Sequence, residues 1–325
     1  MPATPETQVL KNAVLLACRA PSVHNSQPWL WVAEGGVLRL FVDRHRTVPG
    51  TDDSGREAII SCGAVLDHLR VAMLVAGWHA SIKRLPNPEA PDQLASIEFS
   101  AVDHVTDEQR DRATAILQRR TDRLPLGRPT YWDTFEPVLR SAIDDSPVTL
   151  HVLSDDARPQ LVKASQLAEA VRRDDLSYQL ELGWWTSPFV ANEGVPPSAL
   201  ASDEEHRRVD VGRQFPVRSH LERRPEVTVD WSKILVLSTA KDTRADALRC
   251  GEVLSTVLLE CAAAGMAACT LTHLIEIDES RDVVRSLIEQ RGEPQVLIRA
   301  GIAPSMEGHQ APTPQNPLAD VLKIR

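Results

Sequence analysis

Apolar side chains recur at helical spacing along several stretches of the chain. Residues 6–19 form one such stripe, and Pro21 ends the helix that this stripe predicts. The same spacing predicts helices over 56–77, 106–120, 131–144, 157–183, 246–264 and 278–290. Shorter alternating or apolar runs predict strands over 27–33, 37–42, 93–102, 147–153, 234–239, 266–274 and 295–301. This mixture of helices and strands indicates the α+β class.

Two of the predicted helices resemble each other. The segment Cys62–Leu66 (Cys-Gly-Ala-Val-Leu) matches Cys250–Leu254 (Cys-Gly-Glu-Val-Leu), and Ala76-Gly77 matches Ala264-Gly265, at a constant offset of 188 residues. Ala-Gly helix ends are common, because glycine is the usual residue after a helix, so matching ends could also arise independently. The constant offset favours a duplication, and it predicts that the two helices pack about a pseudo-twofold axis. The two related lobes would span residues 1–104 and 105–325.

A proline-rich segment, residues 184–230, interrupts the second lobe without clear periodicity. Connections of this length are usually functional lids or disordered. The segment contains the aromatic residues Trp184, Trp185, Phe189 and Phe215 and the charged residues Asp203, Glu204, Glu205, Arg207 and Arg208. Aromatic groups beside charges suit a segment with one face on a ligand and the other in water, which predicts a lid-like insert. The alternative is a surface insert packed on its own core.

The charge balance argues against a nucleic-acid partner. The chain has 325 residues, with 36 Lys and Arg against 45 Asp and Glu, and a formal charge of -9. An acidic protein has no general attraction for a polyanion. The five cysteines form no Cys-x-x-Cys pair, the N-terminus does not resemble a signal peptide, and the longest nearly uncharged stretch, 253–274, holds Glu260. These features predict a cytoplasmic protein with reduced thiols and no membrane span.

Several common catalytic motifs are absent from the sequence. It contains no Gly-x-Gly-x-x-Gly, no Walker A motif, no His-Glu-x-x-His and no Gly-x-Ser-x-Gly. A P-loop hydrolase, a metalloprotease and an α/β-hydrolase therefore have no sequence support, and we expect no metal site.

The most informative local segment is Ala20–Trp29, with the sequence Ala-Pro-Ser-Val-His-Asn-Ser-Gln-Pro-Trp. Asn25 falls in the turn after the first helix, where its amide offers both a donor and an acceptor. A flat heterocycle with donors and acceptors along one edge would suit this amide. The alternative is a capped helix end, in which Ser22 and Asn25 are ordinary capping and turn residues.

A second segment, Arg119-Arg120-Thr121-Asp122-Arg123, ends a predicted helix. Its arginines and hydroxyl group could hold a phosphate through charge-assisted hydrogen bonds. The alternative is that the arginine charges simply stabilise the C-terminus of the helix.

Together these two segments resemble the FMN-dependent nitroreductase superfamily. The repeated helices and the closing strand 294–301 fit the same pattern, and the length, the duplication and the insert are similar to the Acg group of actinobacterial proteins. In that group one chain imitates the nitroreductase dimer. The resemblance therefore implies a nitroreductase-like fold in which two related lobes form a pseudo-dimer, either as a monomer or within a homodimer.

The resemblance also implies roles for particular residues. Arg119, Thr121 and Arg123 would bind the phosphate and ribityl chain of FMN, with Arg120 contributing its backbone or side chain. Asn25 would face the polar edge of the isoalloxazine ring, with Ser22 and Gln27 shaping the turn. The backbone N–H groups of Cys269, Thr270, Leu271 and Thr272 would point towards the ring. No side chain need act as acid or base, since the flavin carries the redox chemistry.

Two departures from the family pattern affect the expected site. The Asn turn and the Arg-rich element each occur once, and the Asn turn comes first, so we expect one composite FMN site per chain. Related tails often carry an arginine pair near Thr-Pro, whereas this tail reads Thr313-Pro314-Gln315-Asn316-Pro317.

Three functions are open at this point. The first is an oxidoreductase that passes hydride from NAD(P)H to FMN and electrons onward to a nitroaromatic or quinone-like acceptor. The second is a protein that sequesters or stores FMN under the insert with little turnover. The third is a structural or regulatory protein without flavin, in which the two motifs coincide by chance.

Overall fold

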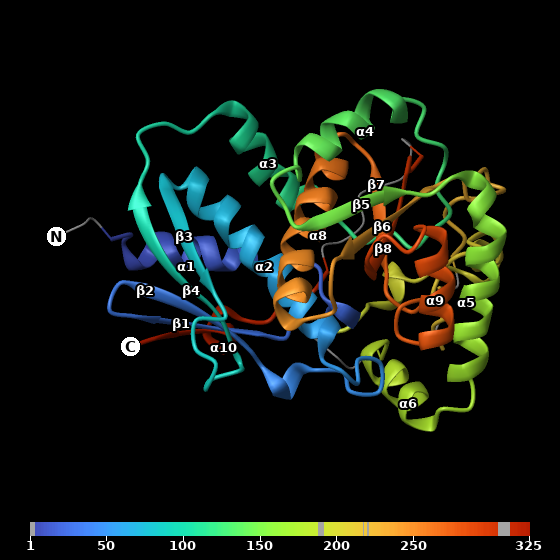
Figure 1. Ribbon diagram of the computed structural model, residues 1–325, viewed down its shortest axis with the longest axis horizontal. Coiled ribbons are helices and arrows are strands. Elements are labelled where there is room, and N and C mark those ends of the chain that lie inside the picture. Colours follow the sequence, from blue (N-terminus) through green and yellow to red (C-terminus); the bar gives the residue numbers. More distant parts are fainter. Residues whose placement is uncertain (1–3, 188–191, 217, 220, 305–312) are drawn as a thin grey trace.

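The computed structural model describes residues 4–187, 192–216, 218–219, 221–304 and 313–325. Two β-sheets lie on opposite sides of a helical centre, which divides the molecule into two lobes (Figure 1). The first sheet contains β1 (Trp29–Glu34), β2 (Val37–Val42), β3 (Trp78–Arg84), β4 (Gln93–Ala101) and β9 (Leu322–Ile324). The second sheet contains β5 (Val148–Val152), β6 (Lys233–Thr239), β7 (Ala267–Leu271) and β8 (Glu293–Gly301).

The helices pack between and around these sheets. Those before the second sheet are α1 (Thr7–Ala17), α2 (Arg56–Val75), α3 (Asp107–Gln118) and α4 (Trp132–Ser141). The remaining helices are α5 (Arg158–Arg172), α6 (Leu176–Trp185), α7 (Asp203–Arg208), α8 (Arg244–Ala263), α9 (Asp278–Leu287) and α10 (Leu318–Val321). The two long helices α2 and α8 pack on each other at the centre of the molecule (Figure 1).

Both lobes follow the same plan. A helix (α1 or α4) precedes two strands, a long helix (α2 or α8) and two further strands. The strands pair in the order first, second, fourth, third in each sheet, as β1-β2-β4-β3 and β5-β6-β8-β7, and these neighbours are all antiparallel. This correspondence confirms the predicted α+β fold with two related lobes.

The crossing of α2 and α8 shows the pseudo-twofold axis directly. A Cβ atom on Gly63 would lie 2.1 Å from the carbonyl oxygen of Leu248, and one on Gly251 would lie 2.0 Å from that of Ile60. Each of these contacts is the counterpart of the other at the offset of 188 residues. The matching Cys-Gly segments of the sequence are therefore the points where the two helix backbones meet, with no room for a side chain.

A buried polar network lies one turn further along the same interface. The Ser255 hydroxyl donates a 2.6 Å hydrogen bond to Asp67 Oδ2, and His68 Nδ1 lies 2.8 Å from the same hydroxyl. Burial favours a neutral carboxyl at Asp67, but the charges of Arg70 and Arg112 and the Ser255 hydroxyl outweigh it and lower the pKa of Asp67.

Replacing Asp67 by asparagine is expected to lower the free energy of unfolding at pH 7 by about 2 kcal/mol, since it removes hydrogen bonds to charged groups. Because the folded-state pKa of Asp67 is lowered, its stabilisation is present above its unfolded value of about 3.9 and disappears as the pH falls through the lower folded value. Urea titrations between pH 2.5 and 7 measure both effects. If the free energies of unfolding of wild type and variant differed by the same amount at every pH in this range, ionised Asp67 would not be the source of the stabilisation.

The structure differs from the sequence-based expectations in three places. The helix predicted over 157–183 is two helices, because the Asp175 side chain accepts a hydrogen bond from Tyr178 N and starts α6 anew. The insert predicted over 184–230 without periodicity contains the end of α6 and the short helix α7. Strand β9 pairs in parallel with β1, which returns the end of the chain to the first sheet. The division at 104/105 falls between β4 and α3 and stays a prediction.

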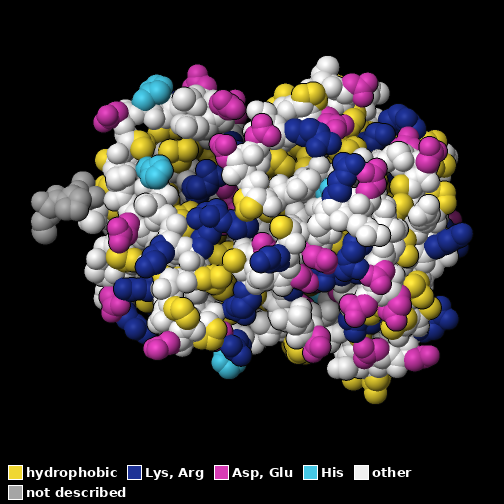
Figure 2. Space-filling view, viewed as in Figure 1, with side chains coloured by type: hydrophobic (Ala, Val, Ile, Leu, Met, Phe, Trp, Pro, Cys, Tyr) yellow, Lys and Arg dark blue, Asp and Glu magenta, His cyan; other side chains and the backbone are white. Residues whose placement is uncertain are grey.

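Among the described residues, α2 is the helix whose length and composition would allow it to cross a membrane. In that helix 83% of the apolar window is buried inside the protein, which is typical of a core helix. On the face shown in Figure 2, basic and acidic side chains are interspersed over both lobes.

Candidate functional site

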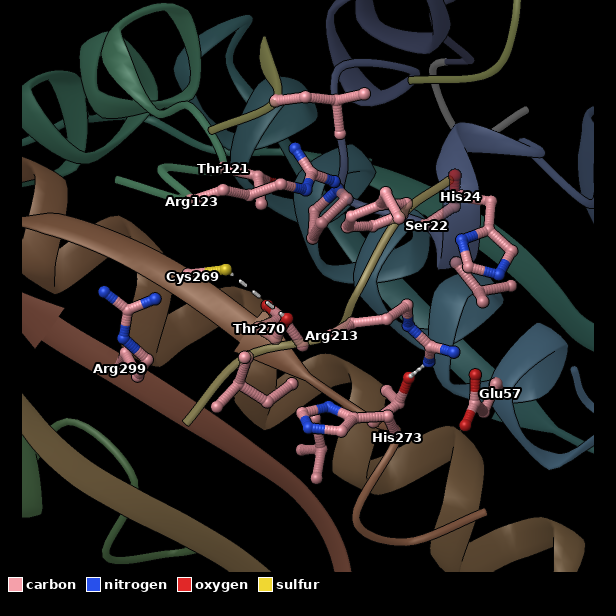
Figure 3. A pocket seen from close by; sticks show the side chains of 18 of the residues that line it. Ser22, His24, Glu57, Thr121, Arg123, Arg213, Cys269, Thr270, His273 and Arg299 are labelled. Carbon is pink, nitrogen blue, oxygen red and sulfur yellow. Dashed lines mark hydrogen bonds between the residues drawn. The ribbon is translucent and has the colours of Figure 1, made fainter. Parts of the chain in front are cut away.

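A cavity lies between the two lobes, with a volume of about 1010 Å³ including the solvent at its mouth. Its walls come from the turn after α1, the start of α2, the Arg-rich segment, β7 with the residues after it, and the insert (Figure 3). Six of the predicted site residues line it: Ser22, Thr121, Arg123, Thr270, Leu271 and Thr272. The cavity is therefore composite, because both lobes contribute to it.

Backbone pairing brings the Arg-rich segment to the cavity. Thr121 forms a parallel β-bridge with Ala268 in β7, and Asp122 N donates a 2.9 Å hydrogen bond to the Ala268 carbonyl. The Asp122 side chain is paired with the buried guanidinium of Arg224, at 2.6 Å and 3.1 Å. The segment thus runs beside β7, which places Arg123 and Thr270 on one wall of the cavity (Figure 3).

Arg119 and Arg120, at the start of the Arg-rich segment, form a cluster of positive charge together with Arg19. Arg119 Nη2 donates to the Arg19 carbonyl at 2.9 Å, and the Nε atoms of all three residues are buried without a hydrogen-bond partner in the described part of the chain. Burial, with the charges of Arg120 and Arg19, lowers the pKa of Arg119 to about 10. None of the three forms an ion pair with an acidic residue among those described, so the cluster is electrostatically suited to an anion.

The Asn turn has a left-handed backbone at three positions, His24, Asn25 and Gln27, with φ between 49° and 58°. Ser22 Oγ accepts a 3.0 Å hydrogen bond from Gln27 N, as expected of a residue that shapes the turn. Asn25 Nδ2 donates to the Pro314 carbonyl at 2.9 Å, and Gln27 Oε1 accepts from Asn316 N at 2.9 Å.

Four of the predicted site residues do not line the cavity, and these are Asn25, Gln27, Arg119 and Arg120. The amides of Asn25 and Gln27 anchor the C-terminal tail, where the sequence has no arginine pair. The two arginines stand behind Thr121, which itself lines the wall. The predicted contacts of all four with FMN stay predictions.

The insert supplies the opposite wall of the cavity, through Leu200, Ala201, His206, Val209, Gly212, Arg213, Phe215 and Arg218. The Phe215 ring lies 5.4 Å from the Arg123 guanidinium carbon and 6.3 Å from the His24 ring, edge to face. Trp185 is buried, whereas Trp184 is 61% exposed, and Phe189 lies outside the described residues. Of the aromatic residues singled out from the sequence, Phe215 is the one that the structure places at the cavity.

Two buried acidic side chains at or next to the cavity were not predicted from the sequence. Glu276 forms a buried ion pair with Arg213, whose guanidinium also donates to Tyr178 Oη at 2.7 Å and to Thr272 Oγ1 at 2.9 Å. Glu57 lines the cavity itself. An acidic residue in the first turn of a helix is common for electrostatic reasons, so its position alone did not single it out.

The position in the first lobe that corresponds to Thr272 holds an arginine. Arg84 lies at the end of β3, where the offset of 188 residues places the counterpart of Thr272. Its guanidinium forms two short hydrogen bonds, 2.5 Å and 2.6 Å, with the carboxylate of Glu252 on α8. Among the described residues no group of three or more His, Cys, Asp or Glu is arranged to hold a metal ion.

The chain has close relatives in Mycobacterium tuberculosis. No protein-family model matches it. A protein described as uncharacterised, Rv3127, is 67% identical over 321 residues, which cover 98% of this chain and 93% of the relative. A protein provisionally named NAD(P)H nitroreductase Acg is 53% identical over 319 residues, covering 98% and 96%. A protein provisionally named NAD(P)H nitroreductase Rv3131 is 33% identical over 324 residues, covering 98% and 92%.

Solved structures give a weaker likeness. The FMN-dependent nitroreductase NfnB from Mycobacterium smegmatis, in complex with NADPH, has a TM-score of 0.41 and 17% identity, over 66% of this chain and 97% of NfnB. A nitroreductase with bound FMN from Desulfitobacterium hafniense has a TM-score of 0.40 and 11% identity, over 62% of this chain and 94% of the nitroreductase. Scores of this size do not define a fold, which here rests on the strand order. The identity to Acg over nearly the whole of both chains does define the family: the chain belongs to the NAD(P)H nitroreductase family, in the group that includes Acg.

Proposed function

We propose that the chain binds one FMN in the cavity between its lobes and acts as an NAD(P)H-dependent reductase. The observation that carries this proposal is the cluster of Arg19, Arg119 and Arg120, three positive charges without an acidic partner among the described residues. Arg119 and Arg120 directly precede Thr121, which lines the cavity that both lobes build. These partly buried positive charges suit an anion, and a ligand with a phosphate at one end fits.

The residues present fit a flavin phosphate at one end and a ring further in. Arg119, Arg120 and Thr121 would hold the phosphate, and Arg123 would lie beside the chain that joins it to the ring. The segment Cys269–Thr272 would run along the ring, with apolar contacts from Ile60, Leu254 and Val296. Bound FMN supplies hydride acceptance and electron transfer, while the protein positions it and excludes water.

The relatives named as NAD(P)H nitroreductases support a nicotinamide electron donor and an acceptor with a nitro group, and we propose that the acceptor is a nitroaromatic or quinone-like compound. Purified protein is expected to be yellow, with the visible absorbance of a bound flavin, and this absorbance should bleach when NADPH is added without oxygen. A colourless protein that shows no saturable binding of added FMN would contradict the proposal.

A second candidate function is the sequestration or storage of FMN with little turnover. The insert favours this second function, because the insert lines one side of the cavity and is held to the rest of the protein by buried ion pairs. Arg224 pairs with Asp122 of the Arg-rich segment, and Asp230 pairs with Arg299 of β8 at 3.0 Å. Such an insert opens rarely, and a covered ring admits bulky acceptors slowly. A flavin that binds tightly but is reduced by NADPH only over hours would favour this role.

Replacing Phe215 by alanine is expected to open the cavity. Its ring lies against Arg123 and His24, so its removal takes away one contact of the insert with each lobe. Quenching of the bound flavin by iodide and its reduction by NADPH should both rise roughly threefold or more. Trp184→Ala is the matched control, since this aromatic side chain also lies in the insert but is 61% exposed to solvent. Equal rates in wild type and both variants would show that the insert does not limit access.

A further inference from the structure

Glu57 is a buried acid whose oxygens have no partner in the described part of the protein. It lies in the first turn of α2 and is 2% exposed. Neither Oε1 nor Oε2 has a hydrogen-bond partner among the described residues, although the residue lines the cavity. A buried polar group without a partner costs free energy, so such a group usually has a role in binding or chemistry. Figure 3 shows its carboxyl group on the same side of the cavity as Arg213 and His273.

Two arginines, Arg213 and Arg56, act electrostatically on Glu57, but neither donates a hydrogen bond to its carboxyl group. The Arg213 guanidinium is hydrogen-bonded to Glu276, Tyr178 and Thr272. Arg56 is the second positive charge that acts on Glu57. Its Nη2 atom donates a hydrogen bond to the Ile275 carbonyl at 3.4 Å.

Negative charge also surrounds Glu57. Asp52 accepts a 2.8 Å hydrogen bond from Ala58 N at the start of α2, and Glu276 lies in the loop after β7. Burial, with the charges of Glu276 and Asp52, raises the pKa of Glu57 well above its usual value, against the smaller opposing effects of Arg213 and Arg56. These surroundings favour the protonated carboxyl, which has one hydroxyl donor and one carbonyl acceptor side by side.

Adjacent donor and acceptor groups complement an N–H beside a C=O. The pyrimidine edge of a flavin ring has this pattern, because its N3–H lies between two carbonyl groups. The amide of Asn25, the other candidate for such an edge, is hydrogen-bonded to the tail instead. Glu57 lies on the side of the cavity that Arg213 and His273 occupy (Figure 3), and Ile60, Leu254 and Val296 add apolar side chains to the lining.

We propose that Glu57 recognises the imide edge of the flavin, accepting a hydrogen bond from N3–H and donating one to a neighbouring carbonyl. The inference rests on the proposed FMN site and names a residue of that site which determines its specificity. It makes the cavity selective for rings with a free lactam or imide N–H. It also explains why a buried, unpartnered acid is kept in the first turn of the central helix.

The test compares FMN with 3-methyl-FMN, in which a methyl group replaces the N3 hydrogen. Both are titrated into apoprotein of wild type, Glu57→Gln and Glu57→Leu, and binding is followed by flavin fluorescence. Wild type should bind FMN at least about tenfold more tightly than the methylated analogue. Glu57→Gln keeps one donor and one acceptor and should retain most of this preference. Glu57→Leu should bind FMN about tenfold more weakly than wild type and discriminate less than about threefold.

A second readout separates binding from a structural role. Glu57→Leu removes a buried unpartnered carboxyl from the apoprotein, so its midpoint in urea should equal or exceed that of wild type. A Glu57→Leu variant that fails to fold would show a structural role for Glu57 and overturn the inference, and so would an unchanged preference for FMN in a folded Glu57→Leu. Neither result bears on the proposal that the wild-type protein binds FMN. If wild type binds no FMN at all, the proposed function itself is wrong, and this inference falls with it.

Discussion

Replacing Gly63 by alanine is expected to lower the free energy of unfolding by about 3 kcal/mol, although alanine is normally the better helix residue by about 1 kcal/mol. The new Cβ atom would lie 2.1 Å from the Leu248 carbonyl oxygen and 2.8 Å from Gly251 Cα. These are backbone atoms in the middle of two buried helices, so they cannot move aside singly. The two lobes would have to separate along the whole of α2 and α8. Equilibrium unfolding in urea measures the effect.

Gly183→Ala is the matched control for this substitution. Gly183 also lies within a helix, α6, but a Cβ atom there would meet nothing within 4 Å. Alanine at this position should therefore stabilise the protein by up to about 1 kcal/mol. Gly251→Ala should behave like Gly63→Ala, because the two glycines are pseudo-symmetric. A neutral or stabilising effect of Gly63→Ala would show that the helices do not cross as described.

Replacing Arg119 by alanine is expected to weaken FMN binding by roughly 1.5–3 kcal/mol, the scale of hydrogen bonds to charged groups. In the apoprotein this arginine is buried beside Arg19 and Arg120, and its pKa is lowered to about 10. Its removal relieves the repulsion by Arg19 and Arg120 but also takes away its hydrogen bond to the Arg19 carbonyl, so the stability of the apoprotein should fall by no more than about 1 kcal/mol. Fluorescence titration with FMN and urea unfolding of the apoprotein measure the two quantities.

Arg110→Ala provides the control for the arginine substitution. Arg110 lies on α3, the helix that ends just before Arg119, but its side chain is 56% exposed and forms an ion pair with Asp107. Its removal should change neither FMN affinity nor stability by more than about 0.5 kcal/mol. Equal FMN affinities in wild type and Arg119→Ala would remove the arginine cluster from the binding site.

The sequence predicted the central architecture because its signal was local and repeated. The Cys-Gly segments at 62 and 250 and the Ala-Gly ends at 76 and 264 marked two equivalent helices, and the structure pairs them at Gly63 and Gly251. The break between α5 and α6 was missed, because the apolar spacing continues across the capping residue Asp175. The pairing of β9 with β1 depends on contacts between the two ends of the chain, which no local pattern records.

The site was predictable only in part, for a similar reason. The Arg-rich segment and the strand after α8 carry recognisable residue types, and the structure brings Thr121 and Thr270 to one cavity. Glu57 could not be identified, because its role follows from burial and from the partners it lacks. The amide of Asn25 is occupied by the Pro314 carbonyl, a contact across almost the whole length of the chain.

The central claim is that two related lobes in one chain build a single flavin site. The most direct test is the FMN content of the purified protein after saturation and desalting, measured from flavin absorbance against protein concentration. The account predicts one FMN per chain, because the Asn turn and the Arg-rich segment each occur once in the sequence. Two FMN molecules per chain, or none, would contradict it.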